Sequence, residues 1–208
     1  MKNLKMIFLA LGCMAALSLT SCLKDNDDDN QGLTPAQISQ CYNAVRGEYS
    51  GKMVYPSRDT KYGSTDTIDV SWSVGEDTML IIRPFPATIV AQQITDAEMK
   101  EALMQEGITG ELRCYIGFFQ LEEEADFLVA PKKVDFPIFY KGGTHTLSLY
   151  FWSNSYSWGF KNLSTGAMGG QLVMSYAILD DDETRNYLNS SSSYASIPII
   201  FSTSIGKQ

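Results

Sequence analysis

The chain of 208 residues carries 24 acidic and 16 basic side chains, which gives a formal net charge of −8. Proteins that bind nucleic acids neutralise phosphates with clustered lysine and arginine side chains. This acidic chain has no such cluster, so nucleic acid is excluded as a partner. The body from Leu33 to Gln208 has the length of one domain.

The first 21 residues have the layout of a secretory signal peptide. A basic head with Lys2 and Lys5 precedes an apolar run from Met6 to Leu19. The run is shorter than the roughly 20 residues that a spanning helix needs, and it ends in small residues. We expect residues 1–21 to be removed on export, which leaves 14 basic and 24 acidic residues and a net charge of −10.

The end of this segment is more specific. Leu19, Thr20, Ser21 and Cys22 resemble a bacterial lipobox, in which an aliphatic and two small residues precede a cysteine. The resemblance implies cleavage before Cys22, a lipid thioether on its sulfur and an acyl chain such as palmitate on the new N-terminus. The alternative is a plain signal peptide followed by an incidental cysteine.

Residues 22–32 form an acidic segment that we interpret as a flexible tether, because a run of like charges repels itself and stays solvated. Its alternating aspartates match the first positions of a calcium loop. Asn30 and Ala36 stand where that loop needs glycine and glutamate, so no metal site is expected here. The segment also resembles the export signal of Bacteroidetes lipoproteins, which implies the outer face of the outer membrane.

The body begins with a predicted helix. Thr34 and Gln37 match a capping box, and Pro35 occupies the first helical position. Apolar residues then recur at three- and four-residue spacing from Ile38 to Val45, and Gly47 ends the helix. We expect a short helix that packs against one end or face of the domain.

A second helix is expected between Ile94 and Gly107. Thr95 and Asp96 lie where a cap would, and Met99 begins a short apolar stripe. Gly107 supplies the C-terminal cap. Such a stripe indicates core packing.

Most of the remaining chain alternates apolar and polar residues, as in a strand with one buried face. The predicted strands are Glu48–Tyr55, Thr67–Val74, Met79–Arg83, Leu112–Leu121, Asp126–Ala130, Val134–Tyr140, His145–Phe151, Tyr156–Phe160, Gln171–Leu179 and Ile197–Thr203. Short strands separated by turns predict a mainly β fold. We expect an antiparallel barrel or sandwich of about eight to ten strands, with a calycin-like barrel among the alternatives, and two short helices.

Cys41 and Cys114 remain in the body once Cys22 carries a lipid. An exported protein can form a disulfide between them, which would stabilise the fold by roughly 4 kcal/mol. The alternative is two buried free thiols that pack as small hydrophobic side chains.

Four segments of the body resemble an uncharacterised family of Bacteroidetes lipoproteins, domain of unknown function 4840. They are LTPAQISQCYNAVRGEYSGKMVYP, DTIDVSWSV, LRCYIGFF and GGTHTLSLYFWSNSYSWGF. The resemblance covers most of residues 33–205 and brings no catalytic motif. It implies an envelope protein with a single domain.

The residues give little support for catalysis. His145 is the single histidine, and we expect it at a strand end near the rim. A hydrolase would need a nucleophile and an acid beside it, and a zinc site would need three or four converging ligands. The acidic runs 122–124 and 180–183 read as solvated turns. We therefore expect no enzyme activity, no metal and no cofactor.

Binding is the better interpretation. The segment from Tyr150 to Phe160 is rich in aromatic residues, and Trp152, Tyr156 and Trp158 are the candidates for stacking on a ligand. The alternative is that these residues are ordinary core and barrel surface, since strands favour aromatic residues. Separately, Thr67 and Thr78 lie in Asp-Thr-aliphatic segments that resemble Bacteroidetes O-glycosylation sites.

Two functions remain open for a lipid-anchored envelope protein. The first is a non-catalytic binding module for a small apolar molecule or a glycan, with a cavity lined by aromatics near Trp152 and Trp158. The second is a structural or protein-interaction module with a filled core and an exposed apolar patch, whose partners would be other envelope proteins.

Overall fold

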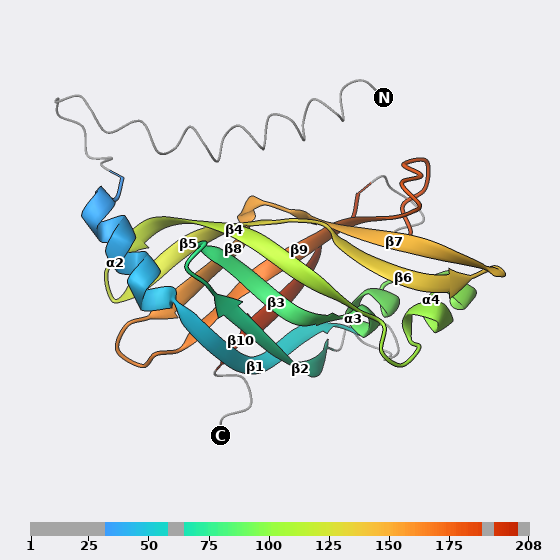
Figure 1. Ribbon diagram of the computed structural model, residues 1–208, viewed down its shortest axis with the longest axis horizontal. Helices are drawn as coiled ribbons and strands as arrows, with labels where there is room; N and C mark the ends of the chain where they lie inside the picture. Colours follow the sequence, from blue (N-terminus) through green and yellow to red (C-terminus); the bar gives the residue numbers. More distant parts are fainter. Residues whose placement is uncertain (1–31, 58–64, 189–193, 204–208) are drawn as a thin grey trace.

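The computed structural model describes residues 32–57, 65–188 and 194–203. It is mainly β, with ten strands and three helices in these residues (Figure 1). The strands are β1 (Gly47–Pro56), β2 (Thr65–Val74), β3 (Met79–Pro86), β4 (Thr109–Leu121), β5 (Glu124–Pro131), β6 (Val134–Tyr140), β7 (Gly143–Trp152), β8 (Asn154–Asn162), β9 (Met168–Leu179) and β10 (Ile197–Ser202). The helices are α2 (Pro35–Val45), α3 (Ala87–Ala91) and α4 (Ala97–Leu103). All ten predicted strands are confirmed.

Eight of the strands close into an antiparallel barrel. The order runs from β1 to β5, passes to β8 and β9, and returns through β10 to β1. In the closing seam, Phe201 of β10 pairs with Met53 on one side and with Gly170 on the other. Of the two predicted architectures, the barrel is therefore correct, and it closes where β10 pairs with both β1 and β9.

The remaining strands β6 and β7 form an arm that continues the barrel. β6 follows β5 after a bend at residues 132–133, and β7 leads into β8 after residue 153. Both pairs belong to one long hairpin, because β5 pairs with β8 and β6 pairs with β7. β9 pairs first with β8 and then with β7, so the arm projects from one end of the barrel (Figure 1).

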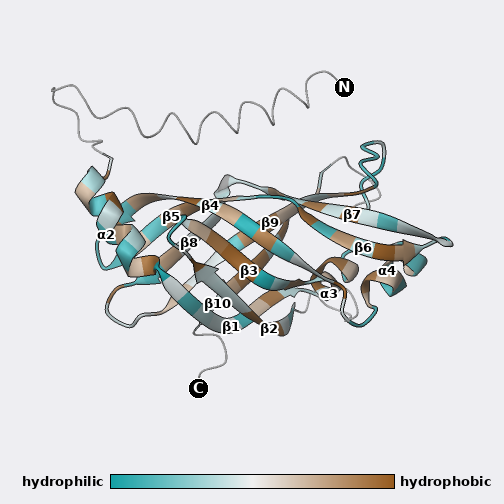
Figure 2. Cartoon of the chain, viewed as in Figure 1, coloured by the Kyte–Doolittle hydropathy of each residue, from teal (hydrophilic) through white to brown (hydrophobic). Residues whose placement is uncertain are grey.

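The barrel interior is filled by large apolar side chains. Strand alternation turns every second residue inward, and Figure 2 shows the matching alternation of apolar and polar residues along the strands. Among the interior side chains with at most 2% exposure are Met53, Trp72, Leu80, Ile82, Leu112, Phe127, Leu172 and Phe201. Trp72 lies edge-on to Phe201, with ring centroids 5.1 Å apart, so the packing extends across the closing seam.

Helix α2 packs against one end of the barrel. Its N-cap is Thr34, and the predicted capping box with Gln37 is present. Tyr42 donates a hydrogen bond from its hydroxyl to the carbonyl oxygen of Ile116 (3.2 Å) and meets the Phe118 ring edge-on. Val45, in the last turn, is fully buried. The helix therefore covers the interior at this end (Figure 1).

Helices α3 and α4 lie at the other end, beside the arm (Figure 1). The N-cap of α4 is Asp96, whose carboxylate accepts the backbone N–H of Met99 at 3.1 Å. This confirms the second predicted helix, although the helix ends at Leu103 and Gly107 lies beyond it with a φ of +84°. Helix α3 was not predicted. Within the described residues, no helix has the length and apolar character needed to cross a membrane.

Candidate functional site: an aromatic ladder on the outer surface

Five aromatic rings form a continuous row on the outside of the barrel, which we call the aromatic ladder. Its members come from β7, β9, β8 and the segment before β10, and are Tyr150, Tyr176, Tyr194, Trp152 and Tyr156. Sequence positions as far apart as 150 and 194 meet here because β7 pairs with β9, and the chain before β10 runs along the other edge of β9.

Neighbouring rings of the ladder are in contact. The centroids of Tyr150 and Tyr176 are 6.2 Å apart, and those of Tyr176 and Tyr194 are 5.7 Å apart. Trp152 lies 5.4 Å from Tyr194 and 5.7 Å from Tyr156. The two ring planes in each pair are inclined to each other by 35–57°, so the rings do not share one plane.

Hydrogen bonds fix the ladder to the backbone. The indole Nε1–H of Trp152 donates to the carbonyl oxygen of Ala195 at 2.8 Å. Ala195 in turn donates its N–H to the carbonyl oxygen of Ser175 at 2.7 Å, which ties this segment to β9. The Tyr176 hydroxyl donates to the carbonyl oxygen of Glu183 at 2.7 Å. Trp152 and Tyr176 are thus held in place before any ligand binds, which lowers the entropic cost of binding.

The exposed part of the ladder lies at its Trp152 end. Tyr156 is 54% exposed and Tyr194 is 42% exposed. Tyr150, Tyr176 and Trp152 are partly buried. Each ring therefore offers an edge or a face to solvent, and the tyrosines add hydroxyl groups that can hydrogen-bond.

Trp158 lies on the same outer face, two residues beyond Tyr156 on β8. It is 41% exposed, and its ring is 6.4 Å from that of Phe160. The candidates Trp152, Tyr156 and Trp158 are thus brought onto one surface. Trp158 points away from the barrel interior, because the alternation along β8 turns Ser157 and Gly159 inward.

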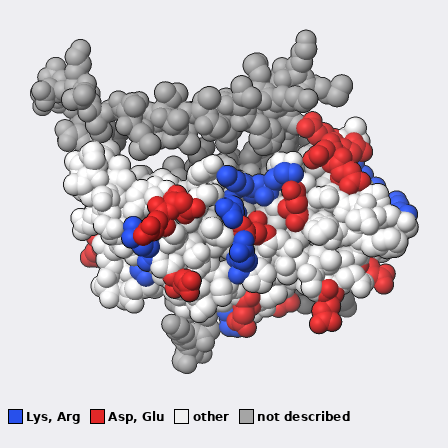
Figure 3. Space-filling view, in the orientation of Figure 1, with Lys and Arg blue, Asp and Glu red and all other residues white. Residues whose placement is uncertain are grey.

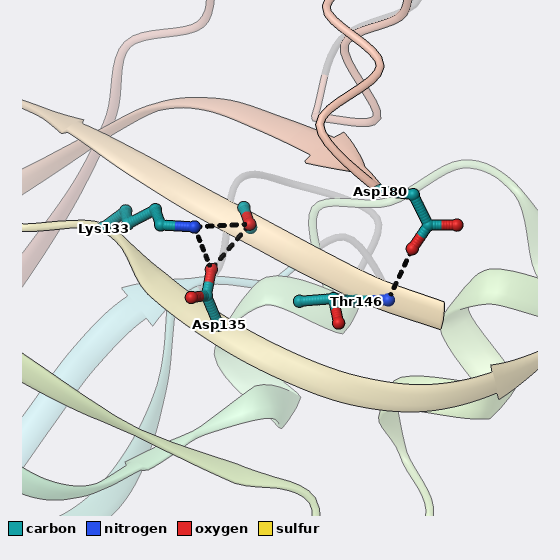
Figure 4. Close-up of polar contacts among 5 residues, drawn as sticks. Lys133, Asp135, Thr146 and Asp180 are labelled. Carbon is teal, nitrogen blue, oxygen red and sulfur yellow. Dashed lines mark hydrogen bonds and ion pairs between the residues drawn. The ribbon is translucent and has the colours of Figure 1, made fainter. Parts of the chain in front are cut away.

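A polar group lies beside the Tyr150 end of the ladder. The Nζ of Lys133 is 3.0 Å from Asp135 and 3.5 Å from the hydroxyl of Ser148. That hydroxyl donates to Asp135 at 2.6 Å, so the three side chains close a triangle across β6 and β7 (Figure 4). The hydrogen bond to Asp135 is the main reason that the pKa of Lys133 is raised. Lys133 therefore stays protonated.

Carboxylates surround this end of the ladder. Burial raises the pKa of the Tyr150 hydroxyl, and the charges of Asp181, Asp135 and Glu183 raise it further, while Lys133 lowers it. In Figure 3 acidic side chains gather at the upper right, where Figure 1 places the segment after β9. The local potential is therefore negative.

His145 lies near this group but is engaged elsewhere. Its Nδ1 is 2.6 Å from Asp180. The other carboxylate oxygen of Asp180 accepts the N–H of Thr146 at 2.8 Å, as Figure 4 shows. These contacts lower the pKa of Asp180, and the hydrogen bond with His145 is the largest cause. The Ser148 hydroxyl is bonded to Asp135 instead. An acid beside His145 is present, as a hydrolase requires, but strand alternation turns His145 and Ser148 to opposite faces of β7.

The two cysteines of the body are free and fully buried, so the disulfide considered for Cys41 and Cys114 is not formed. Cys114 faces the barrel interior from β4, while Cys41 belongs to α2, which contacts β4 at Ile116 and Phe118. Burial raises the pKa of the Cys114 thiol strongly. Both thiols therefore pack as small hydrophobic side chains, which was the alternative prediction.

The other sequence candidates lie apart from the ladder. Thr67 is exposed on β2, and Thr78 is partly buried in the turn before β3 with a φ of +60°. Cys22 and the tether lie outside the described residues. Among the described ranges, no cluster of three or more His, Cys, Asp or Glu side chains is arranged to hold a metal ion.

Sequence reasoning missed Tyr176 and Tyr194 as members of the ladder. Both lie outside the aromatic segment that drew attention to Trp152, and no local pattern links them to it. Only the register of β9 against β7 would have indicated the contact, because it places Tyr176 opposite Tyr150.

Comparison with protein families identifies the class of this barrel. Residues 44–178 match the domain of unknown function DUF4840, and the chain belongs to that family. A comparison with curated proteins gave no significant match, and neither did a comparison with solved structures.

Proposed function

We propose that this protein is a non-catalytic binding module that is held by a lipid on Cys22 at the outer membrane and recognises a glycan with the aromatic ladder. The lipobox and the acidic tether support the anchor and a position at the cell surface. The class of ligand follows from the ladder.

The observation that carries the proposal is the row of touching rings on the outer surface. Sugar rings have apolar C–H faces and polar edges, so they fit surfaces that offer both aromatic faces and hydrogen-bonding groups. The tyrosines of the ladder provide both, with their rings and their hydroxyl groups. The barrel interior is filled by side chains such as Phe127 and Phe201, which favours an external glycan over an enclosed apolar molecule.

The absence of a catalytic role rests on the polar groups beside the ladder. Lys133 is kept protonated by Asp135, so it is a poor base for Ser148. A general base needs a pKa near the working pH. Cys114 lies in the core with a raised pKa, so it is a poor nucleophile.

The test is titration calorimetry of the full chain against neutral hexasaccharides: cellohexaose, laminarihexaose, xylohexaose and mannohexaose. We expect at least one to bind and the Tyr156→Ala variant to lose about tenfold in affinity, because an aromatic contact of this kind contributes about 1.4 kcal/mol. Trp152→Ala should lose more, since it also removes the contacts to Tyr194.

Phe139→Ala is the matched control. Phe139 is an exposed ring on β6 outside the ladder, so its removal should leave glycan affinity within about twofold. Equal losses for Phe139→Ala and Tyr156→Ala would contradict the assignment of the site. No binding of any hexasaccharide would count against a glycan-binding module.

A protein-interaction module is the second candidate, and an apolar patch favours it. The patch consists of three exposed side chains, Leu128, Trp158 and Ile200. They are neighbours across the sheet, because Leu128 pairs with Trp158, and both Trp158 and Ile200 pair with Gln171. Cross-linking in the native envelope tests this. If an Ile200→Lys variant loses a reproducible cross-linked protein that the wild type and Phe139→Ala retain, the interaction module is favoured.

The position at the cell surface has its own test. Intact cells are treated with protease, and the protein is compared with a known surface lipoprotein. We expect both to be cut, because the tether would expose the domain outside the membrane. Survival of this protein while the reference is cut would contradict surface exposure.

A further inference from the structure

The row of exposed rings continues along β8 beyond the aromatic ladder. Tyr156, Trp158 and Phe160 alternate along β8 with the inward Ser157 and Gly159, so all three rings lie on the outer face. Together with the ladder they form a track of seven rings, which begins on the arm and ends near the start of β5. The track is longer than one sugar can cover.

Carboxylates lie at both ends of the track. On the arm, Asp135 accepts the hydroxyl of Ser148 on β7, and the backbone of Glu183 accepts the hydroxyl of Tyr176. In addition to burial, the charges of Asp135, Asp181 and Glu183 all raise the pKa of Tyr150. On the barrel, Asp126 pairs with Phe160. Burial raises the pKa of Asp126, and the charges of the nearby Glu124 and Glu122 raise it further.

The basic groups near the two ends are already engaged. Lys133 is paired with Asp135 at 3.0 Å. Lys161, next to Phe160 in sequence, points to the inner side, where its Nζ lies 4.6 Å from the Tyr49 ring centroid and 2.6 Å from the carbonyl oxygen of Gly166. Lys133 therefore offsets one of the three carboxylates on the arm, and Lys161 does not face the track.

We infer that the track selects uncharged or cationic oligosaccharides of several sugar units and excludes polyanionic ones, an inference that rests on the proposed glycan-binding function. Physiological salt screens exposed charges over about 8 Å, so carboxylates beside the rings at both ends repel a polyanion that lies against those rings. Neutral chains meet no such repulsion, and cationic chains are attracted.

The experiment compares ligands of one length and different charge on the full chain in 150 mM salt. The neutral probes are the four hexasaccharides above with their disaccharides, the anionic probe is hexagalacturonate, and the cationic probe is the glucosamine hexamer. We expect the best neutral hexasaccharide to bind at least tenfold more tightly than its disaccharide. We expect hexagalacturonate to bind at least tenfold more weakly than that hexasaccharide.

Charge variants locate the effect. The variant Asp135→Asn, Asp181→Asn, Glu183→Gln should raise the affinity for hexagalacturonate at least threefold. The control Asp69→Asn, Glu76→Gln, Glu101→Gln removes the same charge from β2, the turn after it and α4, and it should leave that affinity within twofold. A rise of equal size in both variants would overturn the inference, because it would show an effect of net charge alone.

The two proposals fail differently. If neutral chains bind and hexagalacturonate binds within twofold of them, the charge selection is wrong and the glycan-binding function stands. If a disaccharide binds as tightly as its hexamer, the extended track is wrong. If no probe of any charge binds, both the glycan-binding function and this inference are wrong.

Discussion

Trp152 donates its indole N–H to the carbonyl oxygen of Ala195 at 2.8 Å, across 43 positions of sequence. The bond joins the end of β7 to the segment that leads into β10, and it sets the position of the ring that contacts both Tyr194 and Tyr156. One polar contact thus holds together the central part of the ladder.

The first prediction concerns a variant that removes this hydrogen bond but keeps an aromatic ring at position 152. Trp152→Phe should lower the free energy of unfolding by about 1–2 kcal/mol, because the carbonyl oxygen of Ala195 loses its donor and the smaller ring leaves space. Urea unfolding followed by circular dichroism measures the change.

Trp158→Phe is the control for that measurement. It makes the same change on the same outer face, at a residue that is more exposed. Its effect should stay within about 0.5 kcal/mol. Equal destabilisation by the two variants would show that the Ala195 bond contributes nothing specific.

The second prediction concerns the closing seam of the barrel. A methyl group at Gly169 would lie 2.6 Å from the carbonyl oxygen of Phe201, closer than a Cβ can approach a backbone atom. Gly169→Ala should therefore destabilise the barrel by about 1–3 kcal/mol, since β9 and β10 would have to separate. Thermal unfolding monitored by circular dichroism checks it.

Gly117→Ala provides the matched comparison. Gly117 also lies in a barrel strand, but a methyl group there has nothing within 4 Å. This variant should be neutral or slightly more stable, because alanine restricts the unfolded chain. If both alanine variants behave alike, close packing at the seam is not what requires glycine at position 169.

Much of this fold could be predicted from the sequence because strand alternation is local. The segment from Thr67 to Val74 alternates without interruption, and its apolar set does face the interior. Helix α2 was equally clear, since Thr34, Pro35 and Gln37 supply a complete start signal. The short helix α3 was missed because ATIVA is rich in β-branched residues and follows Pro84 and Pro86, so it resembles the end of a strand.

The candidate site was only half predictable for a different reason. Trp152, Tyr156 and Trp158 lie in one local segment and were singled out together. Their outward position depends on the barrel register, and their partners Tyr176 and Tyr194 come from other strands and loops. Alternation assigns two faces to each strand, but long-range pairing decides which face is the core.

The third prediction concerns the two thiols. Cys41 and Cys114 are fully buried and free, and burial raises the pKa of both, so neither should react with iodoacetamide in the native protein. After denaturation in urea both should react. Peptide mass spectrometry before and after unfolding reads each site separately. A peptide pair linked through Cys41 and Cys114 under non-reducing conditions would contradict the free thiols.

The fourth prediction is a pH dependence at the junction of α4 and the arm. Asp96 accepts the N–H of Met99 and the hydroxyl of Tyr140, and it lies 3.4 Å from Arg185. The Met99 bond is the main cause that lowers the pKa of Asp96 below 3.8, with Tyr140 and Arg185 adding to it. A lowered pKa in the folded state means that the charge stabilises the fold above the unfolded value near pH 4. This stabilisation is lost as the pH falls through the folded value.

Asp96→Asn isolates that charge, because asparagine keeps an acceptor for the cap. We expect the variant to be less stable than the wild type by about 1 kcal/mol at pH 6, and this difference to shrink toward zero at pH 3. Urea unfolding at both pH values measures it. Asp69→Asn serves as the control, since its ion pair with Lys52 is exposed and should contribute little at either pH. A difference for Asp96→Asn that is the same at both pH values would show that the cap geometry, rather than the charge, stabilises the junction.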